Sequence, residues 1–152
     1  MGITRDHIVD AVRANARRVY DGIRDLPGIR FRQLPDPEGE LGSAVFLAFD
    51  STAKRERFRA AMKSENVPAN PPGGSVVLPV QPYVENKRTV HPAWPSFTSA
   101  RGKTMRYGES CCPRTIDILG RFAGVSLDPK FTAADTDDIV AAVRKVYPSV
   151  RR

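Results

Sequence analysis

The stretch AVFLAFDSTAKRERFRAAMKSEN, residues 44–66, determines the fold class, because a strand pattern passes directly into a helix pattern there. Residues 44–49 are continuously apolar, which is typical of a central strand buried on both faces. A helix follows, and a polar side chain at residues 50–52 can cap its first turn. Asn66 suits the end of this helix, because asparagine tolerates the left-handed conformation found there. The inward face of the helix is predicted to comprise Phe58, Ala61 and Met62.

The residues before this stretch predict one long helix and one strand. Apolar side chains recur every three or four positions over residues 8–26, which is the spacing of one helix face. Pro27 and Gly28 are expected to end this helix. Residues 29–34 then alternate apolar side chains with arginine, which indicates a half-buried strand. The apolar positions of the helix are Ile8, Val12, Ala16, Val19, Ile23 and Leu26.

The residues after it predict two strands and two helices. We expect a strand at residues 76–80, a helix that begins at Pro113, and a short strand at residues 124–127. Residues 132–135, Thr-Ala-Ala-Asp, fit a capping box for the last helix. We expect Pro148 to stop that helix. The predicted inward residues are Ile116, Leu119 and Phe122 for the first of these helices, and Ile139, Val143 and Val146 for the second.

This order of elements predicts an α+β fold in two layers, with helices on one side of a small, mainly antiparallel sheet. A chain of 152 residues can build its own core, so residues 1–152 are expected to form a single domain. Residues 81–110 follow neither period and are expected to be a long irregular loop. The loop concentrates aromatic and basic side chains. We therefore expect it to be ordered by packing and to contact a partner or a ligand.

The composition excludes several classes of protein. The residues are 41% hydrophobic and 27% charged, which is ordinary for a soluble globular protein and excludes a disordered chain. The longest apolar run is far shorter than the roughly 18 residues of a membrane span, and the N-terminus lacks a signal-peptide pattern. We therefore expect no membrane association and a cytoplasmic location. The net charge is +7, but the basic residues are scattered, so nucleic-acid binding is not the favoured interpretation.

The residues alone predict no self-contained active site. The glycines match neither a dinucleotide-binding nor a P-loop fingerprint, and neither a G-x-S-x-G motif nor metal-ligand spacing occurs. Cys111 and Cys112 are adjacent, which suits neither a framework disulfide nor a zinc site built on cysteine. His91 with one of these cysteines is the single candidate for a nucleophile and its base, and nothing in the sequence fixes the geometry. Cys112 also has a simpler interpretation, as the residue that starts the helix at Pro113.

Two stretches carry a resemblance to a known family. In ARRVYDGIRDLPGIRFRQLPDPEGELGSAVFLAFD, residues 16–50, an arginine-rich helix leads into a strand that begins Leu-Pro-Gly-hydrophobic. In CCPRTIDILGRFAGVSLDPKFTAADTDDIVAAVRKVY, residues 111–147, a helix is followed by a Val-Ser-Leu-x-Pro strand and a capped last helix. In this order and spacing the stretches resemble the smaller, C-terminal domain of the DegT/DnrJ/StrS family of sugar aminotransferases. With the middle of the chain, the resemblance covers nearly the whole sequence.

The resemblance implies the small domain of a fold-type-I pyridoxal phosphate enzyme. Members of the family transfer an amino group to a keto group on a nucleotide-linked sugar or a cyclitol. In these enzymes the large domain supplies the Schiff-base lysine and the phosphate contacts. This sequence resembles only the small domain, so we expect neither catalytic nor cofactor-binding residues in it. The resemblance implies pyridoxal phosphate only together with a large domain, missing in cis or present in trans.

The middle of the chain supplies the candidate binding residues. LPVQPYVENKRTVHPAWPSF, residues 78–97, is similar to the family's proline-rich, histidine-containing segment that approaches the substrate pocket. Tyr83, His91 and Trp94 are therefore the expected substrate contacts. The competing interpretation is that these aromatic residues only pack the loop onto the sheet. A further alternative is a stand-alone binding module for an anionic ligand such as a sugar nucleotide, without catalysis. A chain that lacks its large domain is also expected to expose apolar surface and could form a homo-oligomer.

Overall fold

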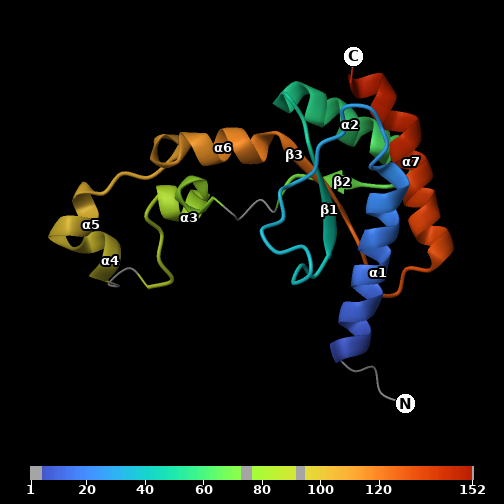
Figure 1. Cartoon of the computed structure of the whole chain (residues 1–152). Coiled ribbons are helices and arrows are strands. Elements are labelled where there is room, and N and C mark those ends of the chain that lie inside the picture. Colours follow the sequence, from blue (N-terminus) through green and yellow to red (C-terminus); the bar gives the residue numbers. More distant parts are fainter. Residues whose placement is uncertain (1–4, 73–76, 92–94, 152) are drawn as a thin grey trace. The chain divides into compact units, whose positions relative to one another are not determined.

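The computed structural model describes residues 5–72, 77–91 and 95–151 (Figure 1). The described residues form two compact units. One lies within Met1–Pro72 and Gly120–Arg152, and we call it the sheet unit; the other lies within Gly73–Leu119, and we call it the inserted unit. The single domain expected from the length remains a prediction. No helix in the described ranges is long and apolar enough to cross a membrane.

The sheet of the sheet unit has three antiparallel strands in the order β1-β3-β2. These strands are β1 (Ala44–Ala48), β2 (Ala69–Asn70) and β3 (Phe122–Ser126). The expectation that residues 44–49 form the central strand was wrong, because β3 occupies the middle and pairs with both neighbours. Along β1, buried and half-buried residues alternate, as on a strand with one covered face. The apolar run therefore reflects a strand whose second face is only partly covered.

Prolines limit strand β2 to two residues. Ala69 pairs with Val125 and Asn70 with Gly124. Pro68 precedes this pair, and Pro71 and Pro72 follow it; proline has no N–H to donate to a ladder. The predicted third strand at residues 76–80 was wrong for its described part, because Leu78–Val80 forms a 3-10 helix, η1. Residue 76 lies outside the described residues.

Residues 29–34 form a single bridge rather than the expected strand. Phe31 bridges Leu47 of β1, and the N–H of Arg32 donates to the carbonyl of Phe46 at 3.1 Å. The N–H of Ala48 donates to the carbonyl of Arg30 at 2.8 Å. Pro35 and Pro37 follow, and neither can extend the ladder. The alternating pattern thus identified an extended segment, but this segment is too short to count as a strand.

Three helices cover the sheet: α1 (Arg5–Ile23), α2 (Thr52–Ser64) and α7 (Ala133–Arg151). Val45 and Leu47 of β1, with their partners Val125 and Ala123 of β3, belong to the same buried cluster as residues of these helices. Figure 1 shows α1 and α7 side by side. A Cβ atom on Gly22 would lie 2.6 Å from Cγ2 of Val140, so glycine permits this close approach. The α+β fold with a small antiparallel sheet is confirmed.

The caps predicted for α2 and α7 are present. The Ser51 hydroxyl accepts from the N–H of Lys54 at 3.2 Å, and Asn66 has a φ of 62° after the end of α2. At α7, the N–H of Asp135 donates to the Thr132 hydroxyl at 3.3 Å, and the Thr132 N–H donates to the Asp135 carboxylate at 2.7 Å. These two bonds form the reciprocal capping box.

Pro148 does not stop α7, which corrects the sequence prediction. The helix continues to Arg151 because Tyr147 and Val150 are buried and hold its last turn on the core. Proline at this point removes the hydrogen bond to the carbonyl four residues earlier and its ring crowds that carbonyl, but the buried contacts of the last turn outweigh this cost. The Lys54 ammonium donates to the carbonyl of Arg151 at 2.8 Å and so satisfies one terminal acceptor.

The inserted unit consists of short helices. Pro113 begins its longest one, as predicted, but Phe122 lies on β3 and not on that helix. The expected irregular loop at residues 81–110 also contains helical turns. The rings of Phe97 and Tyr107 pack edge to face, with centroids 5.8 Å apart. Among the described residues of this unit, no hydrophobic side chain belongs to the buried core. Its α-helices are α3 (Pro82–Glu85), α4 (Pro95–Thr98), α5 (Ala100–Thr104) and α6 (Pro113–Gly120), and a second 3-10 helix is η2 (Glu109–Cys111).

Candidate functional site

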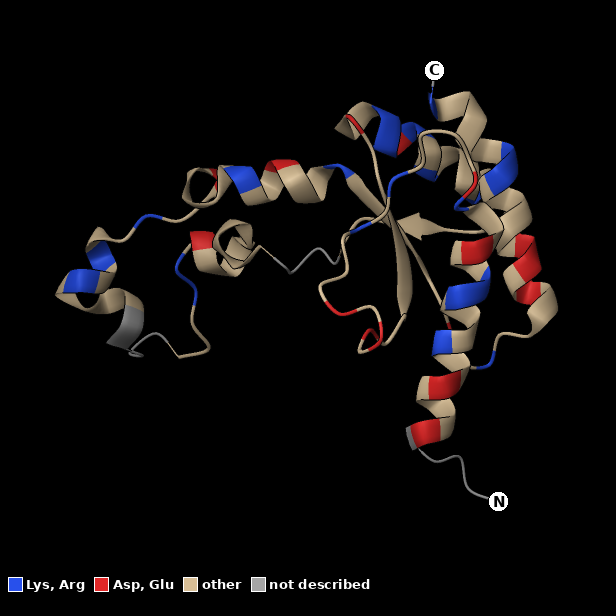
Figure 2. Cartoon of the chain, in the orientation of Figure 1, with Lys and Arg blue, Asp and Glu red and all other residues tan. Residues whose placement is uncertain are grey.

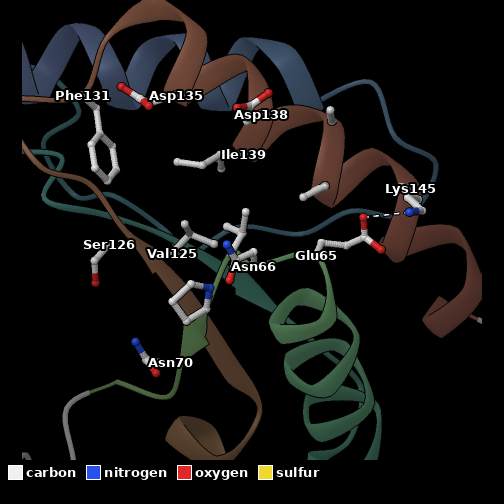
Figure 3. Close-up of a pocket in the computed structure, with 14 residues that line it drawn as sticks. Glu65, Asn66, Asn70, Val125, Ser126, Phe131, Asp135, Asp138, Ile139 and Lys145 are labelled. Carbon is white, nitrogen blue, oxygen red and sulfur yellow. Dashed lines mark hydrogen bonds and ion pairs between the residues drawn. The ribbon is translucent and has the colours of Figure 1, made fainter.

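A groove of about 660 Å³ in the sheet unit lies beside β2 and β3, between the end of α2 and helix α7 (Figure 3). Its apolar lining includes Val125, Ile139 and Ala142, which are almost fully buried. Phe131 and Val67 are half-buried and also line it. The groove therefore offers hydrophobic side chains directly beneath solvent. Its polar and charged lining residues are Glu65, Asn66, Asn70, Ser126, Asp135, Asp138 and Lys145.

Helix α7 supplies one wall of the groove. Asp135, Asp138, Ile139 and Ala142 follow one another at spacings of three, one and three, which places them along one face of the helix. The capping box fixes where the helix begins and therefore where Asp135 lies. The hydroxyl and N–H of Thr132 both donate to the Asp135 carboxylate and lower its pKa. Asp135 is therefore ionised at neutral pH.

The opposite wall comes from the turn after α2, and an ion pair joins the two walls. The Lys145 ammonium lies 2.8 Å from the Glu65 carboxylate (Figure 3). The buried side chain of Asn15 on α1 donates to the carbonyls of Asp128 and Phe131 at 3.0 and 3.3 Å. This side chain thus holds in place the connection that brings Phe131 to the groove.

Other charged clusters of the sheet unit join helices to one another. The Arg18 guanidinium donates to both carboxylate oxygens of Asp137 at 2.7 and 2.8 Å. Arg144 donates in the same way to Asp25, at 2.6 and 2.9 Å, and also to the carbonyl of Gly22. Each arginine lowers the pKa of its partner carboxyl. These side chains are already paired, and we assign them a structural role between α1 and α7.

The substrate contacts expected from the sequence lie in the inserted unit. Tyr83 is on α3 and is 50% exposed. His91 is exposed, and its carbonyl accepts a hydrogen bond from the Thr89 hydroxyl at 2.7 Å. Trp94 lies outside the described residues. A hollow of about 610 Å³ in this unit is lined by neither Tyr83 nor His91. Their role as substrate contacts therefore stays a prediction. The residues that line the hollow are Glu85, Lys87, Lys103, Thr104, Met105, Arg106 and Tyr107.

Both cysteines are free thiols at the junction of η2 and α6. The Cys111 thiol donates to the carbonyl of Arg106 at 3.4 Å. The carbonyl of Cys112 accepts the Ile116 N–H at 3.1 Å, which is the first hydrogen bond of α6, so the helix begins at Pro113 as expected. A capping role for the Cys112 side chain stays a prediction. In the described part of the chain, no three histidine, cysteine or acidic side chains gather as a group that could hold a metal ion.

The six lysines do not fit a covalent cofactor site. A lysine that forms a Schiff base is activated by desolvation or by a neighbouring cation. All six lie within the described residues. Lys54 donates to a helix-terminal carbonyl, Lys145 pairs with Glu65, and Lys87 donates to the carbonyls of Gly102 and Lys103, each at 3.0 Å. The other three are exposed: Lys63, Lys103 and Lys130.

The fold resembles parts of known aminotransferases. The aminotransferase TlmJ from Streptoalloteichus hindustanus matches 97% of this chain with 34% of its own length, at a TM-score of 0.65 and 14% identity. A DegT DnrJ EryC1 StrS aminotransferase from Brucella abortus matches 91% of the chain with 31% of its own length, at a TM-score of 0.53 and 17% identity. The sugar aminotransferase CalS13 from Micromonospora echinospora matches 92% with 31%, at a TM-score of 0.53 and 13% identity.

These similarities establish the fold. The chain spans about a third of the length of the solved structures that it matches. No model of a known protein family matches the sequence. Sequence reasoning found the fold of these aminotransferases but missed the groove, because its lining residues come from three separate stretches. One feature of the sequence did point to the groove. The prolines around β2 show that this strand is too short to pair along the whole edge of β3.

Proposed function

We propose that this chain is the C-terminal, smaller part of a pyridoxal phosphate-dependent aminotransferase that acts on a nucleotide-linked keto sugar or a cyclitol. The observation that carries the proposal is the likeness of the fold, over at least 91% of the chain, to about a third of each of three aminotransferases. The chain completes an active site only together with a large domain, joined to it or in trans.

The environments of the six lysines support the assignment of the cofactor site to a large domain. The residues present do not fit pyridoxal phosphate, because each of the six lysines is either engaged through its ammonium group or exposed. A large domain would therefore have to supply the lysine and the phosphate contacts. This chain would contribute side chains at the substrate, for which Tyr83, His91 and Trp94 remain the candidates.

The test traps the cofactor chemically. The protein is purified from its native source through a tag on this chain, reduced with borohydride, and digested for peptide mapping. We expect a phosphopyridoxyl group on one lysine outside these 152 residues, on the same or a co-purified polypeptide. The matched control is the isolated chain with added pyridoxal phosphate, in which none of the six lysines should be labelled stoichiometrically. A stoichiometric label on one of the six, or no label in the native protein, would contradict the proposal.

A second candidate function rests on the hollow of the inserted unit. This unit contains six basic and three acidic residues, and Lys103 and Arg106 line the hollow. Such a site could bind the phosphates of a sugar nucleotide without catalysis. Calorimetric titration of the isolated chain with uridine diphosphate glucose tests it. Salt-sensitive binding that Lys103→Gln weakens would favour the binding module, and binding unaffected by this change would reject it.

A further inference from the structure

The groove between α2 and α7 is acidic, in a chain that is basic overall. The chain has a net charge of +7. The groove, by contrast, contains the carboxylates of Glu65, Asp135 and Asp138 and a single ammonium, that of Lys145, already paired with Glu65. Figure 2 shows acidic residues on α7. Because the groove is negatively charged although the chain as a whole is positive, the groove favours a cationic occupant.

The lining between these charges is apolar and accessible. Pro68 and Ala141 are exposed, and Phe131 and Val67 are half-buried. Because the side chain of Ala141 is short, the backbone of another chain can approach α7 closely at this point. A small inorganic cation would leave these apolar side chains uncovered. An occupant that combines apolar and basic side chains would satisfy both parts of the lining.

The β2 side cannot supply a backbone donor to β3 at Ser126. Leu127 and Phe49 bond across the β1 side of β3, so the backbone groups of Ser126 are directed to the opposite side. Continuing the register of β2 would place Pro68 opposite Ser126. Because proline has no N–H, β2 cannot donate to the Ser126 carbonyl. Because Pro68 already lies opposite Ser126, an occupant can supply this donor only from a side chain, such as lysine or arginine.

We propose that this groove binds an extended segment of another polypeptide, in which apolar residues alternate with lysine or arginine. The segment would place its apolar side chains against Ile139 and Phe131, and direct its cations to Asp135, Asp138 and the Ser126 carbonyl. The α7 wall from Asp135 to Lys145 is about 15 Å long at 1.5 Å per residue, which matches about five extended residues. The inference does not depend on the proposed aminotransferase function.

The test uses a defined pair of peptides. Fluorescein-labelled Gly-Arg-Val-Lys-Val-Arg-Val-Gly is titrated with the full chain by fluorescence anisotropy, beside the charge-reversed peptide Gly-Glu-Val-Asp-Val-Glu-Val-Gly. We expect the basic peptide to bind at least tenfold more tightly and to lose affinity as salt is raised. In the groove, Ala141→Arg places a large side chain where the peptide backbone would lie, and Asp138→Lys replaces one negative charge by a positive one. We expect each variant to weaken binding at least tenfold.

Asp10→Lys is the matched control, because it makes the same charge change on an exposed residue of α1. It should change the affinity less than twofold, and circular dichroism should show that all three variants are folded. Equal binding of both peptides, or equal effects of Asp138→Lys and Asp10→Lys, would overturn the proposal. Sedimentation velocity gives a third outcome that would overturn the proposal. If the chain self-associates and Ala141→Arg abolishes this self-association, the occupant of the groove is a second copy of the chain.

Discussion

Tyr147 provides a direct measure of how the end of α7 is held on the sheet unit. Its hydroxyl donates to the carbonyl of Gly28 at 2.7 Å, and its side chain is 6% exposed. Tyr147→Phe removes this donor and keeps the ring. A neutral hydrogen bond contributes about 1 kcal/mol net, and the exposed Gly28 lets water replace the donor, so we expect a loss of about 1 kcal/mol. For a chain of this length that corresponds to a fall in Tm of about 2–4 °C.

The assay is urea unfolding followed by far-UV circular dichroism. With an m value of about 2 kcal/mol/M, the midpoint should fall by about 0.5 M. Tyr83→Phe, the same deletion on a half-exposed ring, is the control and should stay within about 0.5 kcal/mol of the parent. A midpoint for Tyr147→Phe equal to that of the parent would refute the assignment of the bond.

The contribution of Tyr147 to stability should depend on pH in the alkaline range. Burial raises the pKa of Tyr147 above its ordinary value of 10.0. The neutral phenol is therefore favoured by folding, and its contribution is present below pH 10 and declines as the pH rises through the folded-state pKa. The stability difference between the parent and Tyr147→Phe should shrink above pH 10. A constant difference across this range would contradict the burial argument.

Two further predictions concern the sheet and the helix pair. A Cβ atom on Gly124 would overlap the Phe46 ring, so Gly124→Ala should cost roughly 1–3 kcal/mol, and Phe46→Leu should relieve most of it in a double-mutant cycle by urea unfolding. Arg144 lowers the pKa of Asp25 below its ordinary 3.8, so stability should be lost as the pH falls below about 4. In thermal unfolding at several acidic pH values, the Tm of Asp25→Asn should fall less steeply with falling pH than the Tm of the parent. Equal slopes would disprove the contribution of the Asp25–Arg144 pair.

Local signals in the sequence identified the elements that local chemistry controls. The caps at Ser51 and Thr132 and the left-handed residue Asn66 satisfy backbone groups within a few residues of themselves, so the sequence pattern contains the whole interaction. Pro148 shows the limit of this reasoning. Its local preference is to end a helix, but the burial of neighbouring residues against the sheet unit outweighs that preference.

Contacts between distant residues decided the remaining features. The sequence by itself determined an α+β chain with two long amphipathic helices, its resemblance to aminotransferases and its lack of a recognisable active site. Only the tertiary structure decided that β3 is the middle strand, that β2 has two residues, and that an acidic groove lies beside them. The physical reason is that strand order and groove lining depend on pairing between segments more than 50 residues apart, such as Ala69 with Val125. Periodicity along the chain reports which residues are buried, but it does not report which segments meet.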